Sequence, residues 1–516
     1  MKSSVTLIAI FLLASTAVYS QSSDTVGPTT VKSHVERFST PEMRAERAEA
    51  EASASLQTNP NDAEALNKRS LARMRLGNYR DAEADLRRAV TINPNVSEYH
   101  ANLGYVLWKL GRATEAITAE LAALKLDEKN YTAHYQLGRF LLRIGDTKQL
   151  TEAAAHLRRA LEIDPRQVEV RFELLATYRA LGDTAQALAQ LDLLQDARPS
   201  DPRVTYVAAL LAADRNDMNA AINGFRDALR RDPTLYGAWQ DLGMSYIKLN
   251  RWKDAADTFA ELATRQAESV EAAYLHALSL FNSGEVKQAE LEARRALRLN
   301  AGMADAHTLL GIILASRGNQ NSEASEALQQ AVALDPKNFD AQFNLGRVQY
   351  VTKDYAGAVR SLTAALELRP DHGQARFFLG TTLEAAGDSE AALKQYEELN
   401  RRDPQSPYGK LGLGALLVKR GKLPEALDAL RQSIKLDATN FEAHLALGRA
   451  LMLNEQFAEA ALSLQQAVAI SPERPDAHYQ LGLALRRLGR TQEAAREFAI
   501  VDKLNTEFRT NAAAPR

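Results

Sequence analysis

The chain has 516 residues, a formal net charge of -2, and 46% hydrophobic and 25% charged residues, which is the composition of an ordinary soluble protein. So small a net charge gives no bulk field that would attract nucleic acid or an acidic membrane surface. The sequence contains no cysteine, which excludes disulfides, cysteine-ligated zinc, thiol catalysis and a lipid-modified N-terminal cysteine.

The first twenty residues predict a signal peptide. The positively charged start Met1–Lys2 precedes an apolar run at 5–14 (VTLIAIFLLA), which has the length of a signal-peptide core and is short for a membrane span. We expect cleavage between Ser20 and Gln21, with cleavage after Ala17 as the alternative. An uncleaved membrane anchor is the competing interpretation. Since no later stretch is apolar enough to cross a bilayer, we expect no membrane insertion after cleavage.

Two short segments separate the signal peptide from the main part of the chain. Residues 21–40 are rich in Ser and Thr and lack apolar periodicity, which predicts a flexible linker. Residues 41–62 have the pattern of a single amphipathic helix that ends near Pro60. We expect this helix to cap the repeats that follow, as a half-repeat.

From residue 63 to residue 508 the sequence is repetitive. Gly77, Gly111 and Gly145 are spaced by 34 residues, and the same register continues to residue 508 with two short insertions, near 147–149 and between 318 and 324. This register predicts thirteen repeats, which begin at Ala63, Ser97, Tyr131, Val168, Pro202, Tyr236, Val270, Ala304, Phe339, Gly373, Pro407, Phe441 and Pro475.

Each repeat predicts two short amphipathic helices, a first helix and a second helix. In the repeat 236–269, the residues that share one face of each helix are Trp239, Leu242, Gly243 and Tyr246, then Ala255, Phe259 and Leu262. The pattern resembles the tetratricopeptide repeat (TPR), W-x-x-L-G-x-x-Y followed by A-x-x-x-F-x-x-A and a proline. Positions are counted from the first residue of each repeat, leaving out the inserted residues. Position 20 of every repeat is alanine, and position 8 is a small residue in every repeat except the fourth, which has Leu175. We expect wider helix packing there.

The resemblance to TPR proteins implies an all-α fold, an α-solenoid of about thirteen helix-turn-helix repeats wound into a right-handed superhelix. The first helices of such a solenoid line a concave groove that receives a partner's peptide or helix. Only the tail 509–516 follows the last repeat. Partner docking or self-association through the C-terminal repeat is one interpretation of this end, and a simply solvated outer face is the other.

In the TPR family, positions 2, 5, 6, 9, 12 and 13 of the first helix face the groove. Aromatic residues often occupy position 5 here, amides sometimes occupy position 6, and arginines at position 9 lie mid-helix, where the helix dipole does not explain them. These groove candidates are Tyr135, Phe172, Tyr206, Tyr274, Phe343, Phe377 and Tyr479; Asn102, Gln136, Asn344 and Gln480; and Arg139, Arg347 and Arg449. Ordinary packing between neighbouring repeats is the alternative explanation of the aromatic residues.

Two groove types known in the family do not fit the sequence. No pair of neighbouring repeats supplies the Lys and Asn set that clamps a C-terminal carboxylate, and the asparagine ladder of O-linked N-acetylglucosamine transferases is absent. Five of the nine histidines stand at position 4, in the place of the family's Trp, and we interpret them as packing substitutes rather than metal ligands. Without a catalytic or phosphate-binding motif, we expect no enzyme, cofactor or metal.

The sequence therefore predicts a non-catalytic protein–protein interaction scaffold that binds an extended peptide or helix in its groove. The alternative is a structural adaptor of a cell-envelope export or assembly complex, docked through its ends or convex edge. The signal peptide, the absence of cysteine and the Ala- and Arg-rich repeats favour an exported bacterial protein, periplasmic or secreted. The identity of the partner does not follow from the fold.

Overall fold

A computed structural model describes residues 40–513 of the chain, with side chains described to residue 506. This part contains twenty-seven α-helices and no strand. The predicted signal peptide, its cleavage site between Ser20 and Gln21, and the linker up to residue 39 lie outside the described residues.

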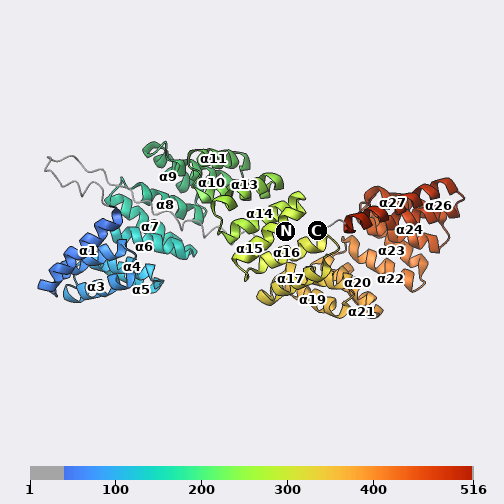
Figure 1. Ribbon diagram of the computed structural model, residues 1–516, viewed down its shortest axis with the longest axis horizontal. Helices are drawn as coiled ribbons and strands as arrows, with labels where there is room; N and C mark the ends of the chain where they lie inside the picture. The colour runs from blue at the N-terminus through green and yellow to red at the C-terminus, as the bar shows by residue number, and fades with distance from the viewer. Residues whose placement is uncertain (1–39, 514–516) are drawn as a thin grey trace. The chain divides into compact units, whose positions relative to one another are not determined.

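The helices follow one another as pairs after an opening helix, α1 (Pro41–Thr58), and can be followed by colour in Figure 1. The first helices of the repeats are α2 (Ala63–Arg75), α4 (Ser97–Lys109), α6 (Tyr131–Ile144), α8 (Val168–Leu181), α10 (Pro202–Asp214), α12 (Tyr236–Lys248), α14 (Val270–Ser283), α16 (Ala304–Ser316), α18 (Phe339–Val351), α20 (Gly373–Ala385), α22 (Pro407–Lys419), α24 (Phe441–Leu453) and α26 (Pro475–Arg487). The second helices are α3 (Tyr79–Ile92), α5 (Ala113–Leu126), α7 (Thr147–Ile163), α9 (Thr184–Ala197), α11 (Met218–Arg231), α13 (Trp252–Arg265), α15 (Val286–Leu299), α17 (Asn321–Leu334), α19 (Tyr355–Leu368), α21 (Ser389–Arg402), α23 (Leu423–Leu436), α25 (Phe457–Ile470) and α27 (Thr491–Ala513).

The chain divides into two compact units between Leu249 and Asn250. We call them the N-terminal unit, which contains α1 to α12, and the C-terminal unit, which contains α13 to α27. Within each unit every helix packs against the next one along the chain. The first helices of many neighbouring repeats also contact each other, as α4 and α6 do in one unit and α20 and α22 do in the other.

Every first helix begins at the residue at which the sequence register predicts a repeat to begin. Local capping explains part of this agreement, because the side chains of Asn130, Asn338 and Asn440 each accept a hydrogen bond from the backbone N–H three residues on, at 2.9–3.0 Å. Such a cap satisfies an N–H group that has no partner inside the helix. The predicted all-α fold with about thirteen helix pairs is confirmed.

A left-handed residue at position 15 ends the first helix of every repeat. Glycine takes this conformation in nine repeats, and Asn216, Asn250, Lys353 and Glu455 take it in the other four, with φ between 55° and 66°. Glycine has no Cβ to clash in this conformation and asparagine tolerates it, whereas long side chains pay a steric cost there. Lys353 and Glu455 therefore hold strained turns.

Small residues let the two helices of one repeat touch. The alanine at position 20 is at most 2% exposed in all thirteen repeats. A Cβ atom on Gly138 would lie 2.6 Å from Cγ of Leu157 and 3.3 Å from the carbonyl oxygen of Ala153. Because these distances are too short for a side chain, position 8 must stay small wherever the helices approach this closely.

The exception at position 8 packs as its size requires. Leu175 is only 1% exposed, so its side chain takes room between α8 and α9 that glycine leaves free elsewhere. These two helices pack less extensively than the other helix pairs within a unit, in agreement with the wider packing expected there.

The side chain at position 4 closes the turn that precedes its own repeat. In nine repeats an N–H of this side chain lies 2.8–3.5 Å from the backbone carbonyl six residues earlier: His100 to Pro94, His134 to Glu128, Arg171 to Pro165, Trp239 to Pro233, His307 to Ala301, Gln342 to Pro336, Arg376 to Pro370, His444 to Ala438 and His478 to Pro472. A carbonyl only accepts, so the facing histidine nitrogen carries the proton. The histidines thus supply a donor to the turn as well as packing.

Glu120 is out of place in the core of the N-terminal unit. It occupies position 24 on α5, where the other repeats place apolar or aromatic side chains such as Leu86 and Phe225. Its side chain is fully buried against Gly104, and neither carboxyl oxygen has a hydrogen-bond partner among the described residues. Burial raises the pKa of Glu120 well above its usual range, because no group offsets the desolvation of the charge.

Replacement of Lys353 or Glu455 by glycine is expected to stabilise the C-terminal unit by about 1 kcal/mol each, because the left-handed strain is removed. Urea denaturation followed by helical circular dichroism measures the change. Asn216→Gly is the control, with a smaller gain, because asparagine already tolerates this conformation. Equal or negative changes for all three variants would show that the turns are not strained.

Glu120→Leu is expected to stabilise the N-terminal unit by about 1–3 kcal/mol at pH 7, the cost of an unsatisfied buried polar group. Since the folded-state pKa is raised, the unfolded chain ionises first. The ionisation penalty is therefore absent below a pH of about 4 and grows as pH rises towards the folded-state pKa. Urea denaturation at several pH values tests this expectation. Glu120→Gln should remove the pH dependence that Glu120 causes but keep a buried polar side chain. Parallel pH profiles of the wild type and Glu120→Leu would contradict it.

Candidate functional site

The predicted groove residues all lie on first helices, in both units. The N-terminal unit holds Asn102 on α4, Tyr135, Gln136 and Arg139 on α6, Phe172 on α8 and Tyr206 on α10; the C-terminal unit holds Tyr274 on α14, Phe343, Asn344 and Arg347 on α18, Phe377 on α20, Arg449 on α24, and Tyr479 and Gln480 on α26. We call the surface that these positions share within one unit its first-helix face. Its chemistry depends on which of these side chains already have partners.

Polar groups at the start of the N-terminal unit's first-helix face satisfy one another. Asn102 donates to the side-chain oxygen of Asn67 at 2.9 Å, and Asn67 donates to Glu98 at 3.0 Å. Arg139 pairs with Glu173 of the next first helix at 3.1 Å. Gln136, which is buried, has no partner for its side-chain oxygen among the described residues. Most of these groups therefore have their hydrogen-bond or ion-pair partners in a neighbouring repeat.

The later repeats of this unit follow the same principle. The Tyr206 hydroxyl donates to Asp241 of the next first helix at 2.6 Å. Burial raises the pKa of Asp241, although the Tyr206 hydrogen bond and nearby positive charges lower it in part. The Arg203 guanidinium covers the ring of Phe172, 4.6 Å from its centroid, and pairs with Glu169 at 3.0 Å. Arginines on this face thus have carboxylates from the chain itself.

Several candidates in the C-terminal unit are also occupied by packing. Tyr274 packs among core residues, and burial raises its pKa to about 12. Arg449 lies 4.0 Å from Asp476 of the next first helix. Tyr479 is 48% exposed, with its ring 5.9 Å from that of Phe498, and it leaves an aromatic surface near the C-terminal end of the chain.

An exposed arginine rests on aromatic rings in the middle of this unit. The guanidinium of Arg347 lies 5.6 Å from the ring centroid of Phe343 and 5.4 Å from that of Phe378, on the next first helix. Phe378 meets Phe343 edge to face at 5.9 Å and lies beside Phe377, whose ring is 5.5 Å from that of Tyr408 on α22. We call these five residues the Arg347 patch.

Arg347 has no acidic partner in the described part of the chain. Its side chain donates to the amide oxygen of Asn344 at 3.2 Å, and Asn344 donates to the backbone carbonyl of Asp340 at 2.8 Å. Burial lowers the pKa of Arg347, because no carboxylate offsets the partial loss of water around its charge. An arginine stays charged at neutral pH even so. The patch therefore presents a partly desolvated positive charge over an aromatic surface.

Glycines bring the helices beneath the patch together. The ring of Tyr396, on α21, lies where a Cβ atom on Gly380 or Gly412 would overlap it. Its hydroxyl lies 3.3 Å from Thr381 and 3.5 Å from Glu384, both on α20. Tyr396 thus fills the space between α20 and α22 and fixes the spacing of the two helices that carry Phe377, Phe378 and Tyr408.

Sequence reasoning missed part of this patch. Phe378 stands at position 6, which was searched only for amides, and Tyr408 stands at position 2, which is mostly acidic in the other repeats. A search for consecutive repeats with aromatic residues at groove positions would have found both. Tyr396 lies on a second helix, at a position that holds leucine or phenylalanine in most other repeats. In the sequence, its hydroxyl is the only feature that sets it apart from those residues.

No group of three or more His, Asp or Glu side chains within residues 40–506 is placed to hold a metal ion. None of the helices described is both long enough and apolar enough to cross a membrane.

The contrast between Tyr206 and Arg347 predicts different effects of substitution on stability. Tyr206→Phe removes the donor to buried Asp241 and is expected to lower the free energy of unfolding by about 1–3 kcal/mol. Arg347→Ala removes no partnered carboxylate and is expected to change it by no more than about 0.5 kcal/mol. Urea denaturation of both variants checks the contrast. A large loss in Arg347→Ala would mean that this arginine is structural.

Comparison of the sequence with models of protein families finds tetratricopeptide repeats along most of the described chain. One tetratricopeptide repeat model matches residues 44–97, 67–131, 102–168, 241–304, 274–320, 411–475 and 454–503, which is more than half of the chain. A second matches residues 146–211 and 351–416, and a TPR repeat model matches residues 313–353. A search of curated protein sequences finds no match.

Solved structures with a similar arrangement of helices include yeast Tom70, with 19% identity, a TM-score of 0.41 and coverage of 86% of this chain and 92% of that one. The Cut9–Hcn1 hetero-tetramer of APC/C gives 15% identity, a TM-score of 0.42, and coverage of 92% and 97%. YrrB, a TPR protein with an unusual peptide-binding site, has 23% identity, a TM-score of 0.32, and coverage of 36% of this chain and 96% of that one. Scores this low carry no argument about function. The repeat register, the thirteen helix pairs and the family models together show that the chain belongs to the tetratricopeptide repeat family.

Proposed function

We propose that the chain is a protein-interaction scaffold whose Arg347 patch binds an extended peptide segment carrying a carboxylate next to an aromatic or aliphatic side chain. The observation that carries the proposal is the guanidinium of Arg347, partly desolvated over Phe343 and Phe378 without an acidic partner. The resemblance to TPR proteins supports it, because first helices line the peptide-binding groove in that family.

The charge of Arg347 favours a carboxylate. A guanidinium binds a carboxylate with two parallel hydrogen bonds, and such a pair is stronger where water is already partly excluded. Arg139, at the same position of an earlier repeat, already has Glu173 as its partner. A bound peptide would supply to Arg347 what the chain itself supplies to Arg139.

The rings around Arg347 favour an apolar neighbour for that carboxylate. Phe377, Phe378 and Tyr408 are half-buried, so each keeps part of its surface open. Aromatic side chains fixed by packing lose little entropy on binding, which is why they are common at the centres of interfaces. Phe343 is only 7% exposed and acts as support beneath the guanidinium.

Selection from a random peptide library displayed on phage tests the proposal on the full chain. The wild type is expected to enrich peptides with Asp or Glu beside an aromatic or large aliphatic residue. Arg347→Glu is expected to weaken the selected peptides by at least about tenfold, or about 1.4 kcal/mol, and to enrich basic peptides instead. Circular dichroism confirms that the variant is folded.

Arg449→Glu is the matched control, because Arg449 has the same position on another first helix and already lies near Asp476. It is expected to retain the peptides of the wild type. If Arg347→Glu binds those peptides as well as the wild type does, the Arg347 patch is not the site.

A second candidate function, docking through the C-terminal end, is favoured by the length of α27. This helix has 23 residues, whereas most of the second helices have 14, and it carries the partly exposed Ile500. A partner that binds the wild type and Arg347→Glu equally, but loses binding with Ile500→Glu, would support this adaptor role.

A further inference from the structure

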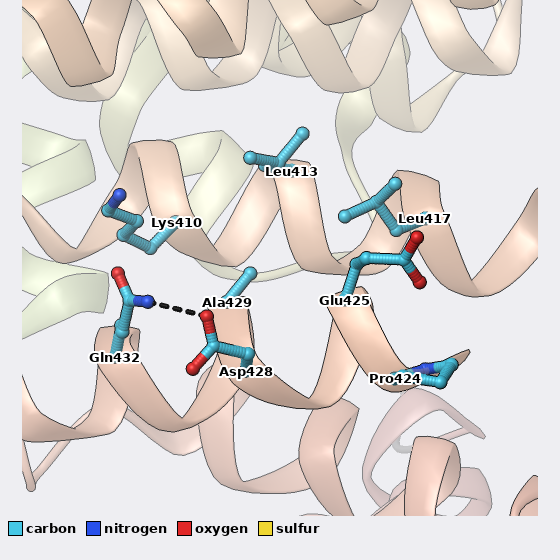
Figure 2. A pocket seen from close by; sticks show the side chains of 8 residues that line it. All are labelled: Lys410, Leu413, Leu417, Pro424, Glu425, Asp428, Ala429 and Gln432. Carbon is cyan, nitrogen blue, oxygen red and sulfur yellow. Dashed lines mark hydrogen bonds between the residues drawn. The ribbon is translucent and has the colours of Figure 1, made fainter. Parts of the chain in front are cut away.

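A hollow lies between the two helices of the eleventh repeat, away from the groove positions. It has a volume of about 490 Å³ and is lined by Lys410, Leu413 and Leu417 of α22 and by Pro424, Glu425, Asp428, Ala429 and Gln432 of α23. Figure 2 shows Lys410 and Gln432 towards one end, Glu425 and Pro424 towards the other, and Leu413 and Ala429 between them. The hollow thus lies within a single repeat.

The other repeats show how closely this place is usually packed. Lys410, Leu413, Leu417 and Ala429 stand at positions 4, 7, 11 and 23 of their repeat. In six other repeats a histidine or tryptophan ring stands at position 4, and the residues at positions 7 and 11 are at most 8% exposed: Leu103 and Leu107, Leu137 and Leu141, Leu242 and Tyr246, Leu310 and Leu314, Leu447 and Leu451, and Leu481 and Leu485. In the eleventh repeat, Leu413 and Leu417 are only partly buried.

The eighth repeat is the nearest comparison. It has the same Leu, Leu and Ala at positions 7, 11 and 23, but His307 at position 4 donates to the carbonyl of Ala301 at 3.0 Å. Lys410 makes no such hydrogen bond to Pro404 in the described structure. The eleventh repeat lacks the ring of the eighth and also has Pro424 and Asp428 where the eighth has Ser322 and Glu326. A flexible lysine keeps its charged end in water rather than on the leucines.

The rim of the hollow selects among the side chains that would fit. The carboxylate of Asp428 accepts from Gln432 at 2.7 Å, Glu425 lies at the other end of the hollow, and Lys410 is the cation of the lining. Leu413, Leu417 and Ala429 favour an apolar body, the carboxylates favour an N–H donor, and the ammonium favours an aromatic face. Tryptophan combines all three, and Trp239 already occupies position 4 of the sixth repeat.

We propose that this hollow is a second binding site, which takes the tryptophan side chain of a partner protein. The partner's indole would lie against Leu413 and Leu417, whose equivalents in many other repeats are buried. The site uses none of the residues of the Arg347 patch, so it stands or falls independently of the proposed groove.

Titration of the full chain, labelled in its leucine methyl groups, with N-acetyl-tryptophanamide tests the site by NMR. The methyl signals of Leu413 and Leu417, assigned from Leu413→Val and Leu417→Val variants, are expected to shift with a dissociation constant of about 1 mM, as suits a single side chain. N-acetyl-leucinamide is expected to shift them at least fivefold less at the same concentration. Absence of shifts, or equal shifts with both probes, would overturn the proposal.

Two matched variants exchange the eighth and eleventh repeats. Lys410→His should place a ring in the hollow and abolish the shifts of Leu413 and Leu417. His307→Lys should open the equivalent place and add shifts at Leu310 and Leu314, with circular dichroism confirming that both variants are folded. Retained shifts at Leu413 and Leu417 in Lys410→His would place the probe elsewhere and overturn the proposal.

Discussion

The contact between a small residue on the first helix and an alanine on the second governs the repeats within each unit, with Leu175 as the exception. Gly138 and Ala153 show its limits, because any side chain at the glycine would overlap Leu157. With the two helices held at this distance, each pair buries one apolar face against itself and another against its neighbours. The first-helix faces and the hollow of the eleventh repeat all depend on this spacing.

Hydrogen bonds to the turns between repeats complement that packing. A planar N–H group at position 4 reaches the carbonyl six residues earlier in most repeats, and His307, Trp239 and Arg376 serve the same purpose there. Where Lys410 stands at this position, that hydrogen bond is absent from the described structure, and Leu413 and Leu417 are only partly buried.

The charged and polar groups of the first-helix faces differ in whether the chain supplies their partners. In the N-terminal unit, Arg139 and Tyr206 are bound by acidic residues of the next repeat, so the polar groups hold the array together. In the C-terminal unit, Arg347 has aromatic rings beneath it and no carboxylate. A charge left without a counter-ion on an aromatic surface gains more from a ligand than one that must first give up its partner.

The sequence alone was enough to predict the helix pairs, the residue at which each repeat begins and the family, because a repeated pattern of small and apolar residues leaves one register in which all thirteen alanines are buried. It also located Arg347 and Phe343. Only the tertiary structure decided which of the predicted groove residues have partners within the chain. The partner of Arg139 or of Tyr206 comes from the next repeat, and the repeat pattern does not show which residues of neighbouring repeats pair. The partial exposure of Phe378 and Tyr408 and the hollow beside Lys410 also appeared only in the tertiary structure. The exposure of a side chain depends on which neighbouring helices cover it.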